Sequence, residues 1–235
     1  MKVFANVLAG GKGLRMGNAE LPKQFIKIGE KPIIVHTIEK FLMHNQIDAV
    51  IVACNVTWID YMNDLIQKYI PAFSEKIYIV DGGKERNDSL KNSVDFIVDE
   101  LNSGEEAIIL THDAVRPFIS HQIITANIEA MQEYDAVDTV VAAVDTIVHS
   151  VEGQIIDEIP NRAEYYQGQT PQTFKVSKLK AVIENVSKED RRIMTDAAKL
   201  FVVNGYSVGL VPGEYSNFKI TTQFDLLVAK AMIKE

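Results

Sequence analysis

Short apolar runs alternate with longer amphipathic segments through much of the chain, and this alternation restricts the possible folds more than any other feature. Each apolar run has the length of a buried strand, and each segment between two runs carries apolar residues at helical spacing. The predicted strands span residues 3–9, 49–54, 77–80, 107–111 and 137–144, and the predicted helices span 32–45, 57–69, 88–101 and 120–134. Strands and helices that alternate in this way form a mostly parallel sheet with helices on both faces. We therefore expect an α/β, Rossmann-like fold that occupies residues 1–235 as one domain.

The alternation stops after Val144. Two short β-like runs, 145–150 and 154–159, flank a turn at Gly153 and predict a hairpin. A hairpin alone cannot bury both of its faces, so we expect it to pack on a second subunit. The later predicted elements are helices at 177–185, 195–204 and 223–233 and extended segments at 207–211 and 218–221. The sequence thus predicts a protruding dimerisation arm at about 145–175, and a homodimer.

Three local signals predict where helices begin. Thr57 with Asp60, and Thr222 with Asp225, have the spacing of a capping box. Ser120 stands where an N-cap is expected before the helix at 120–134. For Asp225, capping explains the carboxylate better than metal binding does.

Composition narrows the class of protein. The net charge of −8 argues against a nucleic-acid partner, because a nucleic-acid-binding domain presents a basic face. Cys54 is the only cysteine, which excludes an intramolecular disulfide and a thiolate-rich metal site. No apolar run reaches the roughly 18 residues of a membrane span or forms a convincing secretion signal. We expect a cytoplasmic protein that binds neither nucleic acid nor membrane.

A glycine-rich segment follows the first predicted strand. Glycines at positions 10, 11, 13 and 17 allow backbone N–H groups to approach an anion, because no Cβ stands in the way. Arg15 offers a planar fork for phosphate oxygens, and Lys23 offers a point charge. The segment matches neither the dinucleotide fingerprint nor the P-loop. It predicts a different triphosphate-binding loop; the alternative is an ordinary surface turn with two solvated cations.

Other polar residues follow the ends of later strands. The carboxyl ends of parallel strands share one edge of a sheet, so the glycine loop, Asp81-Gly82-Gly83 and His112–Pro117 are expected around one crevice. Asp113 could bind Mg²⁺ or position a nucleotide, or it could pair with Arg116 to hold the loop. The polar residues near 86–89 could receive a base or anion at a helix N-terminus, or Asn87 or Asp88 could simply cap that helix.

No nucleophile stands out in the sequence. A Gly-x-Ser-x-Gly elbow is absent, and Cys54 lies inside an apolar run. The cations favour direct phosphoryl or nucleotidyl transfer, in which positioning and charge stabilisation supply most of the catalysis. Arg162 and Lys219, taken alone, are interpreted as surface charges.

An ordered set of motifs carries a resemblance to a known family. The motifs are LAGGKGLRMG, LPKQF, GGKERNDS, THDAVRPF, QGQTPQTF, MTDAAK and FKITT. This set resembles the cytidylyltransferases that join CTP to a polyol phosphate. The resemblance spans nearly the whole chain, from Val7 to the last predicted helix. It implies attack of the polyol phosphate on the α-phosphorus of CTP, with Mg²⁺ bridging the triphosphate and pyrophosphate leaving.

The resemblance also implies roles for individual residues. Arg15, Lys23 and Lys219 would be catalytic, stabilising the triphosphate and the transition state. The implied nucleotide-binding residues are Leu8, Ala9, Gly10, Gly11, Gly13, Asp81, Gly82, Arg86, Ser89 and Asp113. The implied acceptor-binding residues are Arg116, Arg162, which would reach the neighbouring subunit, and Thr195, and Asp113 is the candidate metal ligand.

Within this family, several segments look more like the ribitol-5-phosphate branch, which supplies CDP-ribitol for teichoic acids or capsular polysaccharides. These are HDAVRP, LPKQF, YQGQTPQTF and GEYSNFKITT. That branch implies CTP and ribitol 5-phosphate as substrates, and a ribulose-5-phosphate reductase is a possible partner. The alternative acceptor is methylerythritol 4-phosphate. A non-catalytic CTP sensor is a third alternative, but such a protein is expected to lose Arg15, Lys23 or Lys219, and all three are present.

Overall fold

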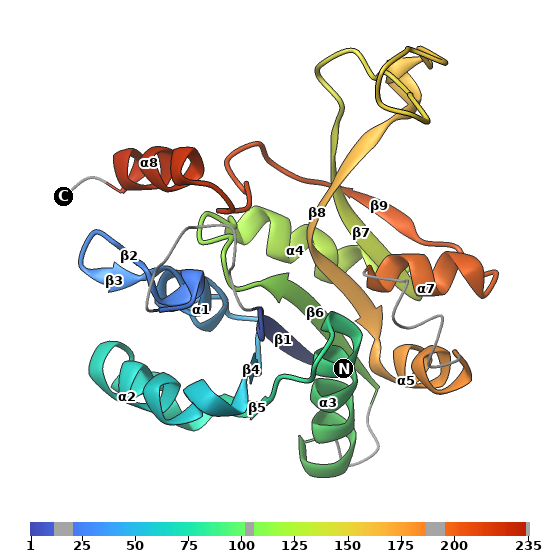
Figure 1. Cartoon of the computed structure of the whole chain (residues 1–235). Helices are drawn as coiled ribbons and strands as arrows, with labels where there is room; N and C mark the ends of the chain where they lie inside the picture. The colour runs from blue at the N-terminus through green and yellow to red at the C-terminus, as the bar shows by residue number, and fades with distance from the viewer. Residues whose placement is uncertain (12–20, 102–105, 187–195, 234–235) are drawn as a thin grey trace.

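The computed structural model describes residues 1–11, 21–101, 106–186 and 196–233, and it centres on a seven-stranded sheet (Figure 1). Across the sheet, the strands run in the order β5 (Ile77–Asp81), β4 (Ala49–Cys54), β1 (Lys2–Ala9), β6 (Ala107–Asp113), β8 (Tyr166–Lys175), β7 (Ala136–Ala142) and β9 (Gly209–Pro212). The strands β5, β4, β1 and β6 are parallel neighbours, and β9 is parallel to β7. The predicted mostly parallel sheet is confirmed.

Strand β8 was not predicted from the sequence. It runs antiparallel between β6 and β7, so β7 does not continue the parallel series beside β6. The segment contains Gly168 and Pro171, which normally argue against a central strand, and its remaining residues are mostly polar. Its buried Gln172 and Thr173 are accepted in the sheet because their side chains are hydrogen bonded.

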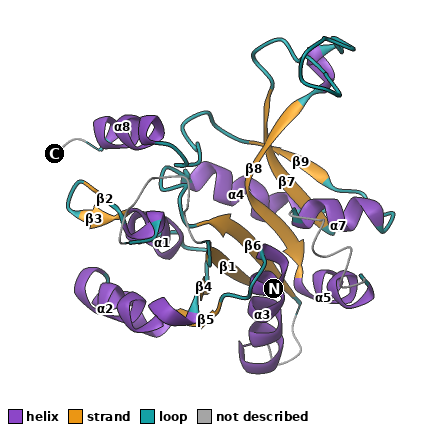
Figure 2. Ribbon diagram, viewed as in Figure 1, coloured by secondary structure: helices purple, strands orange, loops and turns teal. Residues whose placement is uncertain are grey.

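Helices cover both faces of the sheet (Figure 2). The buried clusters assign α1 (Ile33–Leu42), α2 (Ile59–Tyr69) and α4 (His121–Ala130) to one face, and α3 (Arg86–Phe96), α5 (Val176–Asn185) and α7 (Ala197–Val203) to the other. The faces are apolar because strands buried on both sides carry nearly continuous hydrophobic runs, as all six residues of β4 do.

A small third cluster lies at the carboxyl edge of the sheet. It joins α8 (Gln223–Met232) to the two-stranded ribbon of β2 (Lys27–Ile28) and β3 (Lys31–Pro32) through Ile28, Leu226 and Ala229. The remaining short helical turns are η2 (Lys23–Phe25), η3 (Val56–Trp58), η4 (Pro71–Lys76), η6 (Arg162–Glu164) and the π-helical η5 (Ile97–Leu101). Through Ile26, Ile28 and Ile220, the third cluster also packs the segment after Lys23 against the segment that carries Lys219.

The helix-start predictions had mixed outcomes. Ser120 caps α4 by accepting from Ile123 N, and Thr222 and Asp225 form the expected capping box of α8. The Thr57–Asp60 prediction was wrong, because Asn55 caps this region by accepting from Thr57 N. The chain enters a 3₁₀ turn before α2, which moves the capping position two residues earlier than Thr57.

The segment 143–165 between β7 and β8, here called the arm, projects from the body at the top of Figure 1. The two runs of the predicted hairpin meet in an antiparallel bridge, where His149 N donates to Glu158 O at 2.9 Å. Val151 and Ile155 are 79% and 74% exposed. The predicted arm extended to about 175, but Tyr166–Lys175 belongs to strand β8.

None of the described helices is both long and apolar enough to cross a membrane.

Candidate active site

A pocket of about 220 Å³ lies beyond the carboxyl ends of β1 and β6. Parallel α/β sheets bind ligands at this edge, where loops from several strands meet. The lining residues are Leu8, Ala9, Gly10, Gly11, Lys23, Gln24, Gly83, Lys84, Glu85, Arg86, Ser89, Asp113, Ala114, Val115 and Lys219. The structure therefore brings together the glycine loop, the start of α3, the end of β6 and the segment before α8.

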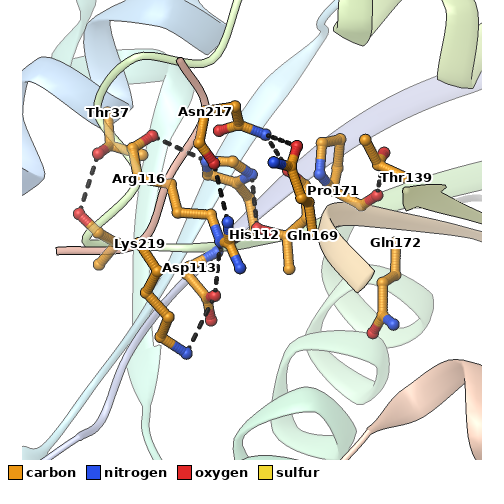
Figure 3. Close-up of polar contacts among 12 residues, drawn as sticks. Thr37, His112, Asp113, Arg116, Thr139, Gln169, Pro171, Gln172, Asn217 and Lys219 are labelled. Atoms are coloured by element: carbon orange, nitrogen blue, oxygen red, sulfur yellow. Dashed lines mark hydrogen bonds and ion pairs between the residues drawn. The ribbon is translucent and has the colours of Figure 1, made fainter. Parts of the chain in front are cut away.

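Asp113 is the centre of the charged groups at this pocket (Figure 3). Arg86 Nη1 donates to its Oδ1 at 2.8 Å, and Arg116 Nε and Lys219 Nζ each lie 3.1 Å from its Oδ2. Burial alone would raise the pKa of Asp113, but the charges of Arg86, Lys219 and Arg116 outweigh it and hold that pKa well below its usual range. The Asp113–Arg116 pair that the sequence left open is present, within a larger ionic cluster.

A buried polar frame holds this cluster in place. Arg116 Nη1 donates to Asn217 O at 2.8 Å, and Asn217 Nδ2 donates to Thr170 O at 2.8 Å. Asp113 N donates to Thr170 Oγ1 at 3.1 Å, which ties β6 to β8. Thr37 Oγ1, on helix α1, donates to Ala114 O at 2.9 Å. Sequence reasoning missed these residues, since each acts through a contact with a distant segment.

His112 completes the frame and is not available for acid–base catalysis. Its ring lies between Arg116 O and Thr170 Oγ1, each 3.0 Å from a ring nitrogen. Since a carbonyl only accepts, Nε2 carries the proton and Nδ1 accepts from Thr170. Burial lowers the pKa of His112 to about 4, so the ring is neutral near pH 7.

The described part of the glycine loop forms one wall of the pocket. Gln24 Nε2 donates to Ala9 O at 2.8 Å and holds the loop against η2, whose first residue is Lys23. A Cβ added to Gly10 would lie 3.3 Å from Ser89 Oγ, whereas one added to Gly11 would meet nothing within 4 Å. Gly10 therefore allows close packing on α3, and Gly11 leaves open space at the pocket. Arg15 and Gly13 lie outside the described residues.

The turn before α3 differs in detail from the prediction. Asp81 and Gly82 are absent from the described lining, and Gly83, Lys84 and Glu85 take their place. Gly82 N donates to Cys54 O at 2.7 Å, so Gly82 packs against β4. A Cβ at Gly83 would lie 2.2 Å from Asp88 Cβ. The helix cap is a reciprocal box between Glu85 and Asp88, with Arg86 as the first helical residue.

Of the predicted acceptor-side residues that the structure describes, neither Arg116 nor Arg162 lines the pocket. Arg162 lies in the arm, is exposed, and donates to Val144 O. Arg116 contacts Asp113 but is not among the lining residues. Thr195 lies outside the described residues. Lys219 lines the pocket, although its segment 218–221 forms no strand and is joined to the β6 loop by Ile220 N donating to Val115 O at 2.9 Å.

The donor set around Asp113 does not fit a directly bound Mg²⁺. Both carboxylate oxygens already receive cationic side chains, whose positive charge opposes a divalent cation. Among the described residues, no three histidines, cysteines or carboxylates come together in a way that could hold a metal. Asp113 is therefore better explained as the group that positions three cations than as a metal ligand.

The pocket combines open backbone at Gly11 with Lys23, Arg86 and Lys219. A pocket of this composition is suited to a polyanion, because open backbone and cationic side chains both favour negative charge. An α/β fold with a cationic pocket at its strand ends is typical of nucleotide-binding proteins. The profile of the 2-C-methyl-D-erythritol 4-phosphate cytidylyltransferase family matches residues 3–235, and the chain belongs to that family.

Relatives in sequence and structure give more detail. The chain is 49% identical over 233 residues to the ribitol-5-phosphate cytidylyltransferase of Streptococcus pneumoniae serotype 2 (strain D39 / NCTC 7466), an alignment that covers 99% of each chain. It is 29% identical to the 4-diphosphocytidyl-2C-methyl-D-erythritol synthase of Anaerococcus prevotii DSM 20548, with a TM-score of 0.81, covering 100% of this chain and 96% of that one. The Francisella tularensis 2-C-methyl-D-erythritol 4-phosphate cytidylyltransferase shares the fold, with a TM-score of 0.80 at 24% identity and coverage of 99% and 100%.

Proposed function

We propose that this enzyme transfers CMP from CTP to D-ribitol 5-phosphate and releases CDP-ribitol and pyrophosphate. The observation that carries the proposal is the 49% identity, over 99% of both chains, to a ribitol-5-phosphate cytidylyltransferase. The alternative acceptor, 2-C-methyl-D-erythritol 4-phosphate, is supported by the family profile and by solved structures at lower identity. A CTP sensor without turnover is disfavoured, because Lys23 and Lys219 line the pocket.

In the proposed reaction, a phosphate oxygen of ribitol 5-phosphate attacks the α-phosphorus of CTP. The new P–O bond forms as the bond to the β-phosphate bridging oxygen breaks, and pyrophosphate leaves with that electron pair. Lys23 and Lys219 stabilise the triphosphate and the crowded α-phosphoryl group, and the backbone near Gly11 approaches the phosphates. Arg15, outside the described residues, is proposed to share this role.

Asp113 would act indirectly by orienting Arg86 and Lys219 toward the reacting phosphates, while Arg116 holds the carboxylate in place. Preorganised charges of this kind avoid reorganisation when the reaction occurs. Mg²⁺ is proposed to enter with the triphosphate and to use phosphate oxygens and water as ligands, as Mg²⁺ sites commonly do. We assign no step to a metal ion held by the protein.

The nucleoside is proposed to lie at the turn before α3. Gly83, Lys84, Glu85 and Ser89 line the pocket there beside the start of the helix, and we place the cytosine and ribose against this wall. The predicted Asp81 and Gly82 precede it in the chain and are not among the lining residues. Backbone groups at a helix N-terminus can recognise a base carbonyl or an anion. The remaining lining, which includes Gly11, Lys23 and Lys219, is then available for the triphosphate.

The arm is proposed to exchange between two subunits of a homodimer. Its exposed apolar side chains, including Val151 and Ile155, need a partner surface. Exchange would bring Arg162 of one subunit to the acceptor phosphate in the other, and Thr195 would contact the acceptor from within the subunit. We further propose a cytoplasmic enzyme whose product serves teichoic acid or capsular polysaccharide synthesis, with a ribulose-5-phosphate reductase supplying the acceptor.

The test is pyrophosphate release from CTP and Mg²⁺, with ribitol 5-phosphate and 2-C-methyl-D-erythritol 4-phosphate supplied separately. Release with ribitol 5-phosphate alone supports the proposal. Release only with 2-C-methyl-D-erythritol 4-phosphate would assign the enzyme to the alternative acceptor. No release with either would favour the sensor, which binding of CTP measured by calorimetry would then support.

A further inference from the structure

A second polar cluster lies on the same face of the sheet as Asp113. It contains Asp138 of β7, Gln172 of β8 and Asp196, the residue that precedes α7. In the sheet register, Asp138 pairs with Gln172 and Gln172 pairs with Thr111, which stands two residues before Asp113 on β6. Because side chains alternate along a strand, Thr111 and Asp113 point to the same face. The cluster is therefore next to the ionic group at the pocket, across β8.

Gln172 joins the two carboxylates. Its side-chain Nε2 donates to Asp196 Oδ1 and Oδ2, each at 2.9 Å, and to Asp138 Oδ1 at 3.2 Å. Carboxylates near neutral pH only accept hydrogen bonds, so this contact determines which end of the amide is nitrogen. Oε1 of the same amide is buried and has no hydrogen-bond partner among the described residues, although Gln172 is only 1% exposed. Buried polar atoms of this kind are rare and need an explanation.

Among the described residues, the carboxylates of this cluster, Asp138 and Asp196, have no ion-pair partner, unlike Asp113 with its three cations. Burial and the nearby Asp196 raise the pKa of Asp138 to about 6. The two carboxylates, which are only partly buried, are suited to a neutral ligand that carries several O–H donors.

The position of the cluster agrees with an acceptor molecule that has one anionic end. The charges of Arg86 and Arg116 act on Asp138 and lower its pKa, so the cluster lies within electrostatic reach of the pocket cations. A phosphate would stay with the cations, and a chain of hydroxyl groups could extend toward the acceptors. A metal ion explains the cluster poorly, because the Gln172 N–H group already lies between the carboxylates.

We propose that Asp138, Gln172 and Asp196 form the subsite that binds the hydroxyl groups of the polyol acceptor. This inference rests on the proposed function, because it names the part of that site that selects the acceptor. Asp138 is the residue of this subsite that is best suited to a mutational test. Asp196 also caps α7 by accepting from Ala198 N and Lys199 N, and Gln172 also belongs to the central strand β8. The described hydrogen bonds of the Asp138 side chain lead only to Gln172.

The experiment compares wild type with Asp138→Ala, and uses Asp135→Ala as the matched control. Asp135 lies one residue before β7, and its carboxylate pairs with Lys175 at 2.9 Å on the surface. We expect Asp138→Ala to raise the KM for ribitol 5-phosphate by roughly tenfold to 100-fold, the range for losing a hydrogen bond to a charged group. The KM for CTP should stay within about twofold, and the control should match wild type for both substrates.

A second, shorter acceptor shows whether Asp138→Ala removes a contact with the hydroxyl groups or disturbs the site as a whole. Erythritol 4-phosphate has one hydroxyl-bearing carbon fewer than ribitol 5-phosphate, so Asp138→Ala should reduce the preference for the longer acceptor. An unchanged KM for ribitol 5-phosphate, or an equal loss with both acceptors, would overturn the subsite.

The same comparison distinguishes this failure from failure of the proposed function. If wild type uses only 2-C-methyl-D-erythritol 4-phosphate, the proposed function fails, and an unchanged KM for that acceptor in Asp138→Ala would overturn the subsite as well. If wild type turns over neither acceptor, the subsite is tested by measuring the binding of ribitol 5-phosphate to wild type and to Asp138→Ala by calorimetry. Binding that weakens in Asp138→Ala supports the subsite, and absent or unchanged binding overturns it.

Discussion

Lys219 Nζ lies 3.1 Å from Asp113 Oδ2, although the two residues come from distant parts of the chain. Asp113 ends a central strand, and Lys219 belongs to a segment that joins the β6 loop through Ile220. The pair shows how the site is built: a buried carboxylate at the sheet edge collects cations from α3, the β6 loop and the C-terminal segment. Of these cations, Arg86 and Lys219 line the pocket.

Asp113→Asn should destabilise the protein near pH 7 by about 1 to 3 kcal/mol, because three cations lose their shared anion and two of them remain partly solvated. The pKa of Asp113 is lowered in the folded state, so its contribution is present above pH about 4 and is lost as pH falls below that value. Urea unfolding of both proteins at pH 7 and at pH 3 measures the difference. Equal stability at pH 7 would contradict the role of Asp113 as the shared anion.

Lys23→Ala should lower kcat by about 10²-fold and leave the fold intact, the usual effect of removing a preorganised transition-state contact. Lys27→Ala is the matched control, since Lys27 is an exposed lysine in the adjacent ribbon and does not line the pocket. Steady-state kinetics and thermal unfolding of both variants check the prediction. A near-normal kcat in Lys23→Ala would remove Lys23 from the transition state.

Much of the fold could be predicted because the buried parallel strands consist of continuous runs of apolar residues in the sequence. The runs at 3–9 and 49–54 correspond closely to β1 and β4. Strand β8 could not be recognised in this way, since Gln172 and Thr173 are buried through hydrogen bonds with distant side chains rather than through apolarity. Periodicity reports apolar burial only, so a polar central strand leaves no such pattern.

The pocket lining was predictable where the sequence carries a local pattern, as in the glycines at 10 and 11 and the residues around Asp113. The partners that hold Asp113 and Arg116 were not. Asn217 and Thr170 enter the site from other segments, and nothing in their own neighbourhoods marks them. The sequence predicted Gly82 at the pocket, but Gly83 lines it instead. This difference depends on three-dimensional packing, because the backbone at Gly83 passes close to Asp88.

Gly11→Ala should fold normally but bind CTP less well. A Cβ at this position meets no atom of the described structure within 4 Å, so the change in stability should stay within about 0.5 kcal/mol. The added methyl group would occupy space that a triphosphate needs close to the backbone, and we expect roughly a tenfold rise in the KM for CTP. Thermal unfolding verifies the fold. A folded variant with a normal KM for CTP would show that the phosphates bind elsewhere.

Exchange of the arm can be tested by mixing two defective variants, Lys23→Ala and Arg162→Ala. If Arg162 serves the partner's site, each mixed dimer contains one site with both residues intact. After complete mixing, about a quarter of all sites should be active. Activity measured after unfolding and refolding the two variants together checks this, with each variant refolded alone as the control. No recovery, despite mixed dimers confirmed by mass spectrometry, would place Arg162 in its own subunit's site.

Asp138→Asn should stabilise the protein at pH 7 while weakening acceptor binding. The folded protein raises the pKa of Asp138 to about 6 from a usual value of 3.8, through burial and the nearby Asp196. Between these two values the folded state holds more protons than the unfolded state, so stability decreases as pH rises through this range. At pH 7 the charged Asp138 therefore costs about 1 to 3 kcal/mol, which the uncharged variant recovers.

The pH dependence separates this explanation from a better fit of the asparagine side chain. The gain in unfolding free energy should be full at pH 7 and should largely vanish below pH about 4, where Asp138 is protonated in both states. Urea unfolding across this range measures it. Asp135→Asn, which breaks the surface pair with Lys175, should give no gain at any pH. A less stable Asp138→Asn at pH 7 would show that the carboxylate serves the fold, whereas a more stable variant with poor acceptor binding is typical of a residue kept for function at the expense of stability.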